Sequence, residues 1–226
     1  ISDPERLRRE MQGDDIVFHT AALKHVVMCE RSPMDSVQSN IIGVNNVAQA
    51  AIDARVKKVV FTSSDKAVNP TNVMGTSKLM GERLITAANS NYCSGDTIFL
   101  STRFGNVLGS TGSVVPIFKR QIEVGGPITL TDQDMTRFVM STEQAVKLVV
   151  DSAALAKGGE VMITKMPVIK ISDLAEVMIE ELAPLYGYQP ESIKIIEIGS
   201  KPGEKLYEEL MSNEEIRRAI ELDNYF

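Results

Sequence analysis

Two short apolar runs separated by a helical pattern constrain the fold of this chain most. "DDIVFHTAAL" (Asp14 to Leu23) and "KKVVFTSSD" (Lys57 to Asp65) each place a β-rich apolar stretch ahead of small or polar residues. Such runs are typical of buried parallel strands that end in a loop. Between them, apolar residues recur at helical spacing from Val37 to Ala51. This stretch therefore predicts a strand, a helix and a second, parallel strand.

The same alternation continues downstream. Residues 77–89 read as a helix, residues 97–107 as a third strand, and residues 113–126 as a helix closed by glycines. Two further helices are expected, one from Ser141 and one from Ser172 to Gly187. Strands that alternate with helices of this length predict a parallel α/β sheet with helices on both faces, which is a doubly wound fold.

The start of the chain lacks a feature that a dinucleotide-binding domain needs. Such a domain begins with a strand, a glycine-rich turn and a helix, and "GSTGS" (Gly109 to Ser113) does not have the required glycine spacing. The chain instead opens on a helix start, with Ser2 or Asp3 as the cap and Pro4 in the first turn. We expect that one or more strand–helix units precede this chain in the natural protein. The alternative is a complete fold that begins with a helix.

Charge and composition exclude several classes of function. The formal net charge is -6, and lysines and arginines are interspersed with acidic residues, which argues against a nucleic-acid-binding surface. The sequence has no apolar run near the roughly 20 residues that span a bilayer and no signal segment, so a cytoplasmic location is expected. His19 and His25 have no acidic or thiol cluster beside them, and no metal site is predicted.

A longer motif carries the functional hypothesis. "SSDKAVNPTNVMGTSK" (Ser63 to Lys78) resembles the active-site segment of the UDP-N-acetylglucosamine 4,6-dehydratases of polysaccharide and flagellin-glycan biosynthesis, which are extended short-chain dehydrogenases/reductases. The resemblance extends to four more segments in the family's order: residues 19–26, 101–118, 125–138 and 201–210. Members of this superfamily place a catalytic tyrosine four residues before the lysine, where this chain has Met74. This chain resembles the large, membrane-attached members of the family, which have methionine at the position of Met74.

The resemblance implies a partial Rossmann-like sheet with a smaller α/β substrate-binding region. Residues 1–107 would be the C-terminal part of the dinucleotide-binding domain. Residues 108–226 would mainly bind the sugar nucleotide, with about 139–165 returning to the sheet. The implied cofactor is NADP or NAD, and the implied substrate is UDP-N-acetylglucosamine, used for surface polysaccharide or glycan. A homo-oligomer and membrane attachment through upstream segments are also implied.

The resemblance also assigns roles in the reaction. A 4,6-dehydratase moves a hydride from carbon 4 of the hexose to carbon 6 by way of the nicotinamide and eliminates water across carbons 5 and 6. Asp65 would be the general acid at the 6-hydroxyl, and Lys66 the base at carbon 5. Ser64 would hydrogen-bond the 4-hydroxyl, while Lys78 would bind the nicotinamide ribose and stabilise the alkoxide. The alternative is that Asp65 caps a turn and Lys66 is a solvated loop charge.

Further candidates surround this motif. The cofactor would be contacted, besides Lys78, by Ala21, Ala22, Leu23, Asn40 and Thr62. The sugar nucleotide would be contacted by Lys24, His25, Asn106, Ser113, Val114, Arg137 and Glu204, with the arginine on the diphosphate and the glutamate on ribose hydroxyls. The alternative for Lys24 and His25 is that they are polar loop residues after the strand. For the region after Asn106 it is a turn that needs glycine for its backbone angles, and for Arg137 and Glu204 it is surface ion pairs.

Two other functions remain open from the sequence. A 4-epimerase or keto-sugar reductase on the same scaffold would lean on the tyrosine and has no evident need for the adjacent Asp65 and Lys66. A non-catalytic sugar-nucleotide-binding module would explain both the missing tyrosine and the missing glycine-rich turn. The mass of the product separates dehydration from epimerisation, because only dehydration removes water.

Overall fold

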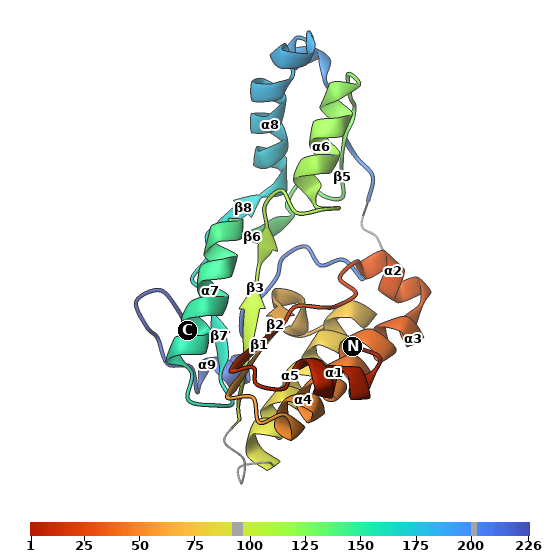
Figure 1. Cartoon of the computed structure of the whole chain (residues 1–226). Coiled ribbons are helices and arrows are strands. Elements are labelled where there is room, and N and C mark those ends of the chain that lie inside the picture. Colours follow the sequence, from red (N-terminus) through yellow and green to blue (C-terminus); the bar gives the residue numbers. More distant parts are fainter. Residues whose placement is uncertain (92–96, 200–202) are drawn as a thin grey trace. The chain divides into compact units, whose positions relative to one another are not determined.

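The structure is a computed structural model that describes residues 1–91, 97–199 and 203–226. It divides into two compact units (Figure 1). The sheet unit comprises Ile1–Phe104, Glu143–Lys165 and Glu209–Phe226, and the second unit comprises Gly105–Thr142 and Met166–Glu208. The sequence predicted that, of residues 108–226, only about 139–165 return to the sheet. In the structure, Glu209–Phe226 belongs to the sheet unit as well.

A parallel sheet forms the centre of the sheet unit. Its strands lie in the order β1 (Ile16–His19), β2 (Lys58–Ser64), β3 (Ile98–Phe104) and β7 (Val161–Ile163), and every neighbouring pair is parallel. The predicted parallel α/β sheet is therefore confirmed. Since all strands run the same way, the polar residues that follow β1 and β2 lie at the same edge of the sheet.

Helices cover the two faces of this sheet. On one face lie α1 (Pro4–Glu10), α4 (Gly43–Asp53) and α5 (Val73–Asn91), which pack with apolar side chains of β2 such as Val59 and Phe61. On the other face α7 (Thr142–Leu155) places Leu148 and Ala153 in a core with Val60 and Leu100. Side chains alternate between the faces of a strand, so the same β2 run supplies both cores.

The predicted first helix is confirmed and begins as expected. Asp3 is its cap and accepts a hydrogen bond from the Arg6 backbone N–H at 3.0 Å, with Pro4 as the first helical residue. The predicted helix between β1 and β2 is also present, but it is preceded by α2 (Val26–Arg31) and α3 (Pro33–Ser36) and begins as a π-helix, η1 (Val37–Ile42). The sequence pattern did not predict this π-helix, within which Asn40 is buried.

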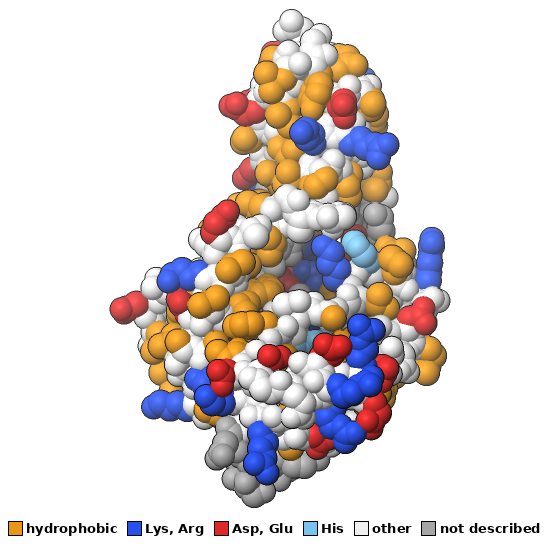
Figure 2. Space-filling model, viewed as in Figure 1, with side chains coloured by type: hydrophobic (Ala, Val, Ile, Leu, Met, Phe, Trp, Pro, Cys, Tyr) orange, Lys and Arg blue, Asp and Glu red, His pale blue; other side chains and the backbone are white. Residues whose placement is uncertain are grey.

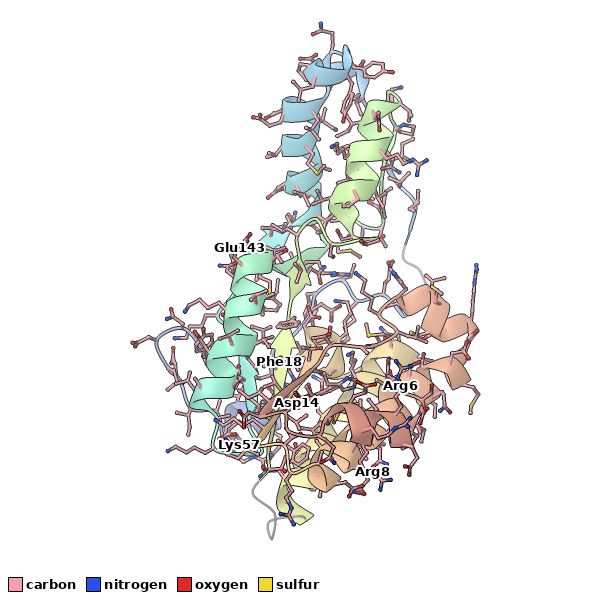
Figure 3. The ribbon with its side chains drawn as sticks, in the orientation of Figure 1. Arg6, Arg8, Asp14, Phe18, Lys57 and Glu143 are labelled. Carbon is pink, nitrogen blue, oxygen red and sulfur yellow. The ribbon has the colours of Figure 1, made fainter. Side chains whose placement is uncertain are left out.

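Strand β1 forms one border of the described sheet. Phe18 pairs in register with Val60, so its side chain lies on the same face as α7, yet it is 44% exposed (Figure 3). Hydrophobic side chains also gather on the outer surface of α7, where Val146 and Val150 are exposed (Figure 2). Beyond β7, the chain end pairs with the sheet through two hydrogen bonds between Ile163 and Phe226.

The second unit has its own strands and core. Its strands are β4 (Asn106–Val107), β5 (Ile128–Leu130), β6 (Thr136–Met140), β8 (Val168–Lys170) and β9 (Ile195–Glu197), and its helices are α6 (Val114–Glu123) and α8 (Ile171–Leu182). Two short 3-10 turns, η3 (Pro184–Tyr186) and η4 (Pro190–Ser192), follow α8. Strand β6 pairs with β4 in parallel and with β8 in antiparallel orientation. Phe118 and Ile122 of α6 pack with Ala175 and Ile179 of α8.

Candidate active site

The predicted catalytic turn lies directly after β2. Strand β2 ends at Ser64, and the 3-10 turn η2 (Asp65–Ala67) follows at once. The Ser64 hydroxyl accepts a hydrogen bond from the Lys66 backbone N–H at 3.3 Å and donates one to Oδ1 of Asp65 at 2.9 Å. Ser64 thus caps the turn and orients the carboxylate.

Asp65 and Lys66 form an ion pair at this strand end, in which Asp65 is buried and Lys66 is half-buried. The Lys66 ammonium donates to Oδ1 of Asp65 at 3.0 Å, and the exposed fractions of the Lys66 and Asp65 side chains are 20% and 0% respectively. The other carboxylate oxygen, Oδ2, is buried and has no hydrogen-bond partner among the described residues. A buried carboxylate oxygen without a partner carries a desolvation cost, which a hydroxyl group of a ligand would relieve. Lys66 is thus paired with Asp65 and is not the solvated loop charge of the alternative interpretation.

Lys78 reaches the same strand from helix α5. Its ammonium donates to the Thr62 carbonyl oxygen at 2.9 Å and lies 5.0 Å from the centre of the Phe61 ring. Burial lowers the pKa of Lys78 to about 8, although its electrostatic interactions with Glu82 and Cys29 act in the opposite direction. A lysine with this pKa can gain or lose a proton near neutral pH.

Helix α5 begins against the catalytic turn. Gly75 allows this approach, because a Cβ at this position would lie 2.2 Å from the Lys66 carbonyl oxygen. The backbone N–H of Gly75 donates to Oδ1 of Asn72 at 2.8 Å, and that of Val73 donates to Oε1 of Glu30 at 2.7 Å. Met74 is buried in this first turn, and its thioether has no proton to transfer.

Asn40 fixes the loop that follows β1. Its side-chain amide accepts from the Leu23 backbone N–H at 2.8 Å and donates to the Leu23 carbonyl oxygen at 2.9 Å, and also to the Ser77 hydroxyl at 2.9 Å. Ser77 directly precedes Lys78 on α5, so Asn40 ties the loop to the part of the helix that carries this lysine.

The other candidates in this loop are more open to solvent. Ala21 is exposed and Ala22 is half-buried. Lys24 and His25 are exposed, and His25 directly precedes α2. The loop therefore presents its polar side chains outward, while Asn40 holds its backbone at Leu23.

His19 was not predicted as a site residue, but the structure places it here. It ends β1, pairs in register with Phe61, and its ring centre lies 5.6 Å from that of Phe61. Burial, followed by the charge of Lys78, lowers the pKa of His19 to about 4. Its Nε2 is buried without a hydrogen-bond partner among the described residues. The sequence feature that could have indicated His19 as a site residue is its position at the end of a predicted strand, directly before small residues.

The remaining candidates lie in the second unit. Asn106 is in β4, Ser113 precedes α6 with a buried hydroxyl that has no partner among the described residues, and Val114 opens that helix. Arg137 of β6 is buried and donates to the carbonyl oxygens of residues 136, 205 and 206 at 2.7, 2.8 and 3.1 Å, respectively.

The surface ion-pair alternative for Arg137 is wrong, because carbonyl oxygens hold its buried guanidinium. These contacts fasten β6 to the segment that contains Glu204. Residues 201 and 202, which begin the last segment of the family resemblance, lie outside the described residues.

Comparison with solved structures gives the class of protein. Pen from Bacillus thuringiensis matches with a TM-score of 0.95 and 52% identity, covering 99% of this chain and 68% of Pen. DesIV from Streptomyces venezuelae, a dTDP-glucose 4,6-dehydratase solved with NAD bound, matches with a TM-score of 0.80 and 22% identity, covering 96% of this chain and 70% of DesIV. The chain has the α/β fold of the NAD-binding short-chain dehydrogenases/reductases.

The family follows from the sequence comparisons. The model of the family described as "Polysaccharide biosynthesis protein" matches residues 1–226, and the chain belongs to this family. "Uncharacterized membrane protein MJ1061" of Methanocaldococcus jannaschii is 54% identical over 226 residues, which are 100% of this chain and 68% of that protein. Among the described residues, no helix is long and apolar enough to cross a membrane.

Relatives with named activities modify nucleotide sugars. The "UDP-N-acetylglucosamine 4,6-dehydratase (inverting)" of Campylobacter jejuni is 41% identical over 227 residues, which cover 100% of this chain and 65% of the relative. The "UDP-glucose 4-epimerase" of Rickettsia akari is 42% identical over 217 residues, covering 96% of this chain and 61% of the relative. The chain thus spans about two thirds of the length of these proteins.

Proposed function

We propose that this chain is part of a nucleotide-sugar 4,6-dehydratase that converts UDP-N-acetylglucosamine to a 4-keto-6-deoxy sugar nucleotide. The observation that carries the proposal is the pairing of the buried Asp65 with Lys66 at the carboxyl end of β2, with Oδ2 of Asp65 left without a partner among the described residues. Open α/β sheets bind their ligands at this edge. Elimination of water needs an acid and a base held side by side, and this pair supplies both.

The residues around Lys78 fit a nicotinamide cofactor. Two buried polar atoms without partners among the described residues, Nε2 of His19 and Oδ2 of Asp65, belong to the ends of neighbouring parallel strands. The cofactor would be held by Lys78 and Thr62, and by the loop that Asn40 fixes, Ala21 to Leu23. When bound, NAD or NADP would accept the hydride from carbon 4 and return it to carbon 6.

The chain's own side chains would move the protons. Ser64 would hydrogen-bond the 4-hydroxyl, and Lys78 would take up or stabilise the charge that forms when this hydroxyl is oxidised. Oxidation at carbon 4 acidifies the proton on carbon 5, so a well-placed base of moderate strength suffices. Lys66 would remove this proton, and Asp65 would donate one to the departing 6-hydroxyl.

The contact between Lys66 and Asp65 would complete the cycle. Before the elimination, a proton would pass from the Lys66 ammonium to the Asp65 carboxylate, and the 3.0 Å hydrogen bond between Nζ and Oδ1 is short enough for this transfer. Lys66 would then be a neutral base and Asp65 a protonated acid, and the elimination would restore the ion pair. When the hydride returns to carbon 6, carbon 5 would take up a proton that balances the one lost by the 4-hydroxyl. None of these steps needs a proton from residue 74, which explains how methionine can occupy the position of the usual tyrosine.

A 4-epimerase is the second candidate, because the Rickettsia akari relative with that name is 42% identical over 217 residues. Epimerisation removes and returns a hydride at carbon 4 alone. It therefore gives no role to an acid and a base beyond the groups that act on the 4-hydroxyl. The adjacent Asp65 and Lys66 thus favour dehydration.

Mass spectrometry of UDP-N-acetylglucosamine incubated with the full-length natural protein and NAD or NADP tests the proposal. We expect a product about 18 mass units lighter, the mass of the water eliminated. The variant Asp65→Asn should lower the rate by about 100-fold or more, as loss of a general acid does. Asp35→Asn changes an exposed aspartate of α3 and is the matched control. A product of unchanged mass would favour the epimerase, and full turnover by Asp65→Asn would contradict the role of Asp65.

A further inference from the structure

Three charged side chains, of which Arg103 and Glu82 are buried and Glu215 is half-buried, form a network next to the candidate site. The guanidinium of Arg103 in β3 binds both oxygens of Glu82, with Nε to Oε1 at 2.9 Å and Nη2 to Oε2 at 2.7 Å. It also binds both oxygens of Glu215 at 3.0 and 2.6 Å, and Nη1 donates to the Leu210 carbonyl oxygen at 3.0 Å. The exposed fractions of the Arg103 and Glu82 side chains are 1% and 4%. A single buried arginine is thus held by two carboxylates.

This network connects the C-terminal segment to the two elements that carry the site. Arg103 pairs in register with Ser63, the residue before Ser64. Glu82 follows Lys78 by four residues on α5, so the two side chains lie on the same face of that helix. Glu215 lies in the short helix α9 (Asn213–Ile216), where a capping box with Ser212 orients its carboxylate.

The charges of the network do not cancel. Burial opposes the ionisation of Glu215, but hydrogen bonds from Arg103 and Ser212 lower its pKa to about 2, so it is ionised at neutral pH. One guanidinium between two carboxylates leaves one net negative charge, one helical turn from Lys78. Among the described residues, the other titratable groups that interact electrostatically with Lys78 are His19 of β1 and Cys29 of α2, and the turn η2, which carries Asp65 and Lys66, packs against α5.

We propose that Arg103 and Glu215 are positioning residues for Lys78. They hold the Glu82 carboxylate in one orientation against β3, and through it they fix α5 and the electrostatic potential at the Lys78 ammonium. The C-terminal segment of the chain is thereby part of the support of the site. The functional meaning of this inference rests on the proposed role of Lys78, but the coupling between Glu215 and Lys78 can be measured without any turnover.

The test is the titration of Lys78 by NMR in the full-length protein with isotope-labelled lysine, the signal being assigned from the variant Lys78→Arg. Glu215→Gln removes one negative charge and keeps the shape of the side chain. We expect the measured pKa of Lys78 to fall by roughly half a unit, because the ammonium form loses a stabilising charge. Where turnover is detected, its decline at high pH should move to lower pH by the same amount.

Glu214→Gln is the matched control. Glu214 is the neighbouring residue of α9, but its carboxylate is exposed and pairs with Arg217 and Arg218 on the surface. We expect it to leave the titration of Lys78 unchanged. Glu215→Asp keeps the charge and should remain close to the wild type, which also covers the case that Glu215→Gln does not fold.

An unchanged Lys78 titration in Glu215→Gln, or an equal shift in Glu214→Gln, would overturn the inference. If Glu215→Gln does not fold, Glu215→Asp gives the test. Because this variant keeps the negative charge, a fall of about half a unit in the pKa of Lys78 would also overturn the inference. A selective shift in a protein that does not convert UDP-N-acetylglucosamine would support the coupling and contradict the proposed function. The two failures are therefore distinguishable.

Discussion

Burial decides the behaviour of the side chains at the edge of the sheet. Lys78 and His19 both lie against the Phe61 ring, and burial is the largest cause of the lowered pKa of each. Both groups favour their neutral forms more than they would in water. At Lys78 this brings proton exchange close to neutral pH, and in the proposed reaction this lysine would take the place of an ionisable group at Met74.

His19 leads to a prediction about stability and pH. Its pKa is about 4 in the folded protein, against an ordinary value of 6.5, so the unfolded chain binds the additional proton first as pH falls. Its contribution to stability is complete above pH 6.5 and is lost as pH falls through about 4. At ~1.4 kcal/mol per pKa unit, the loss amounts to about 3 kcal/mol.

Denaturant unfolding at several pH values measures this effect. The stability difference between the wild type and His19→Gln should change by about 3 kcal/mol in favour of the variant between neutral and acidic pH. His25→Gln alters an exposed histidine and should follow the wild type. Parallel pH curves for the wild type and His19→Gln would contradict the account of His19.

The sequence predicted the strand end at Ser64 that carries the candidate catalytic turn, but not the surroundings of that turn. The apolar run before Ser64 predicted a buried strand, and the end of such a strand is an expected site. Whether Asp65 is buried, and which of its oxygens finds a partner, depends on α5 and on the Lys66 side chain folding back. His19 was not predicted as a site residue because its surroundings also come from another element: Phe61 belongs to the neighbouring strand β2.

At the scale of elements, helix α5 determines the geometry of the site. It carries Met74 and Lys78, and its first turn packs against η2 through Gly75. Asn72 and Glu30 satisfy two backbone N–H groups of this first turn. The capping glutamate comes from α2, so the helix start is fixed by a contact that no local pattern indicates.

Gly75→Ala tests the approach of α5 to the catalytic turn. The new methyl group would lie 2.2 Å from the Lys66 carbonyl oxygen, so the helix or the turn must move. We expect a loss of unfolding free energy of about 2 kcal/mol or more, as overpacking of a rigid contact causes. Turnover should fall further than stability alone explains, because Lys66 is displaced.

Gly43→Ala is the matched control in helix α4. Its new methyl group would meet the end of the Ile1 side chain at 2.6 Å, and this flexible side chain can move away. Alanine favours a helix over glycine by about 1 kcal/mol, so stability should be unchanged or slightly raised. A Gly75→Ala protein as stable and active as Gly43→Ala would show that the close approach is not required.

Some elements could be predicted from the sequence and others could not. The strands of the sheet and the helices between them follow from apolar periodicity. The expected helix from Ser172 to Gly187 ends earlier, at Leu182, because Pro184 cannot continue it and begins a 3-10 turn. The π-helix before Gly43 has no sequence signature of its own, since its apolar spacing also fits an ordinary helix.

At the scale of the whole molecule, segments distant in sequence share one fold. The sheet unit takes three separate stretches of the chain, and Arg103 joins two of them through Glu82 and Glu215. A sequence pattern reports neighbours along the chain, so it could not show that residues 209–226 pack with β3 and β7. The family membership, by contrast, covers the whole chain from residue 1 to residue 226.

We propose that this site transfers a hydride from carbon 4 to carbon 6 and eliminates water, with methionine in place of tyrosine. The most direct measurement follows UDP-N-acetylglucosamine labelled with deuterium on carbon 4 through the reaction of the full-length natural protein with unlabelled NAD or NADP. We expect a product about 18 mass units lighter than the labelled substrate, with the deuterium on carbon 6. A product of unchanged mass with the deuterium still on carbon 4 would contradict it.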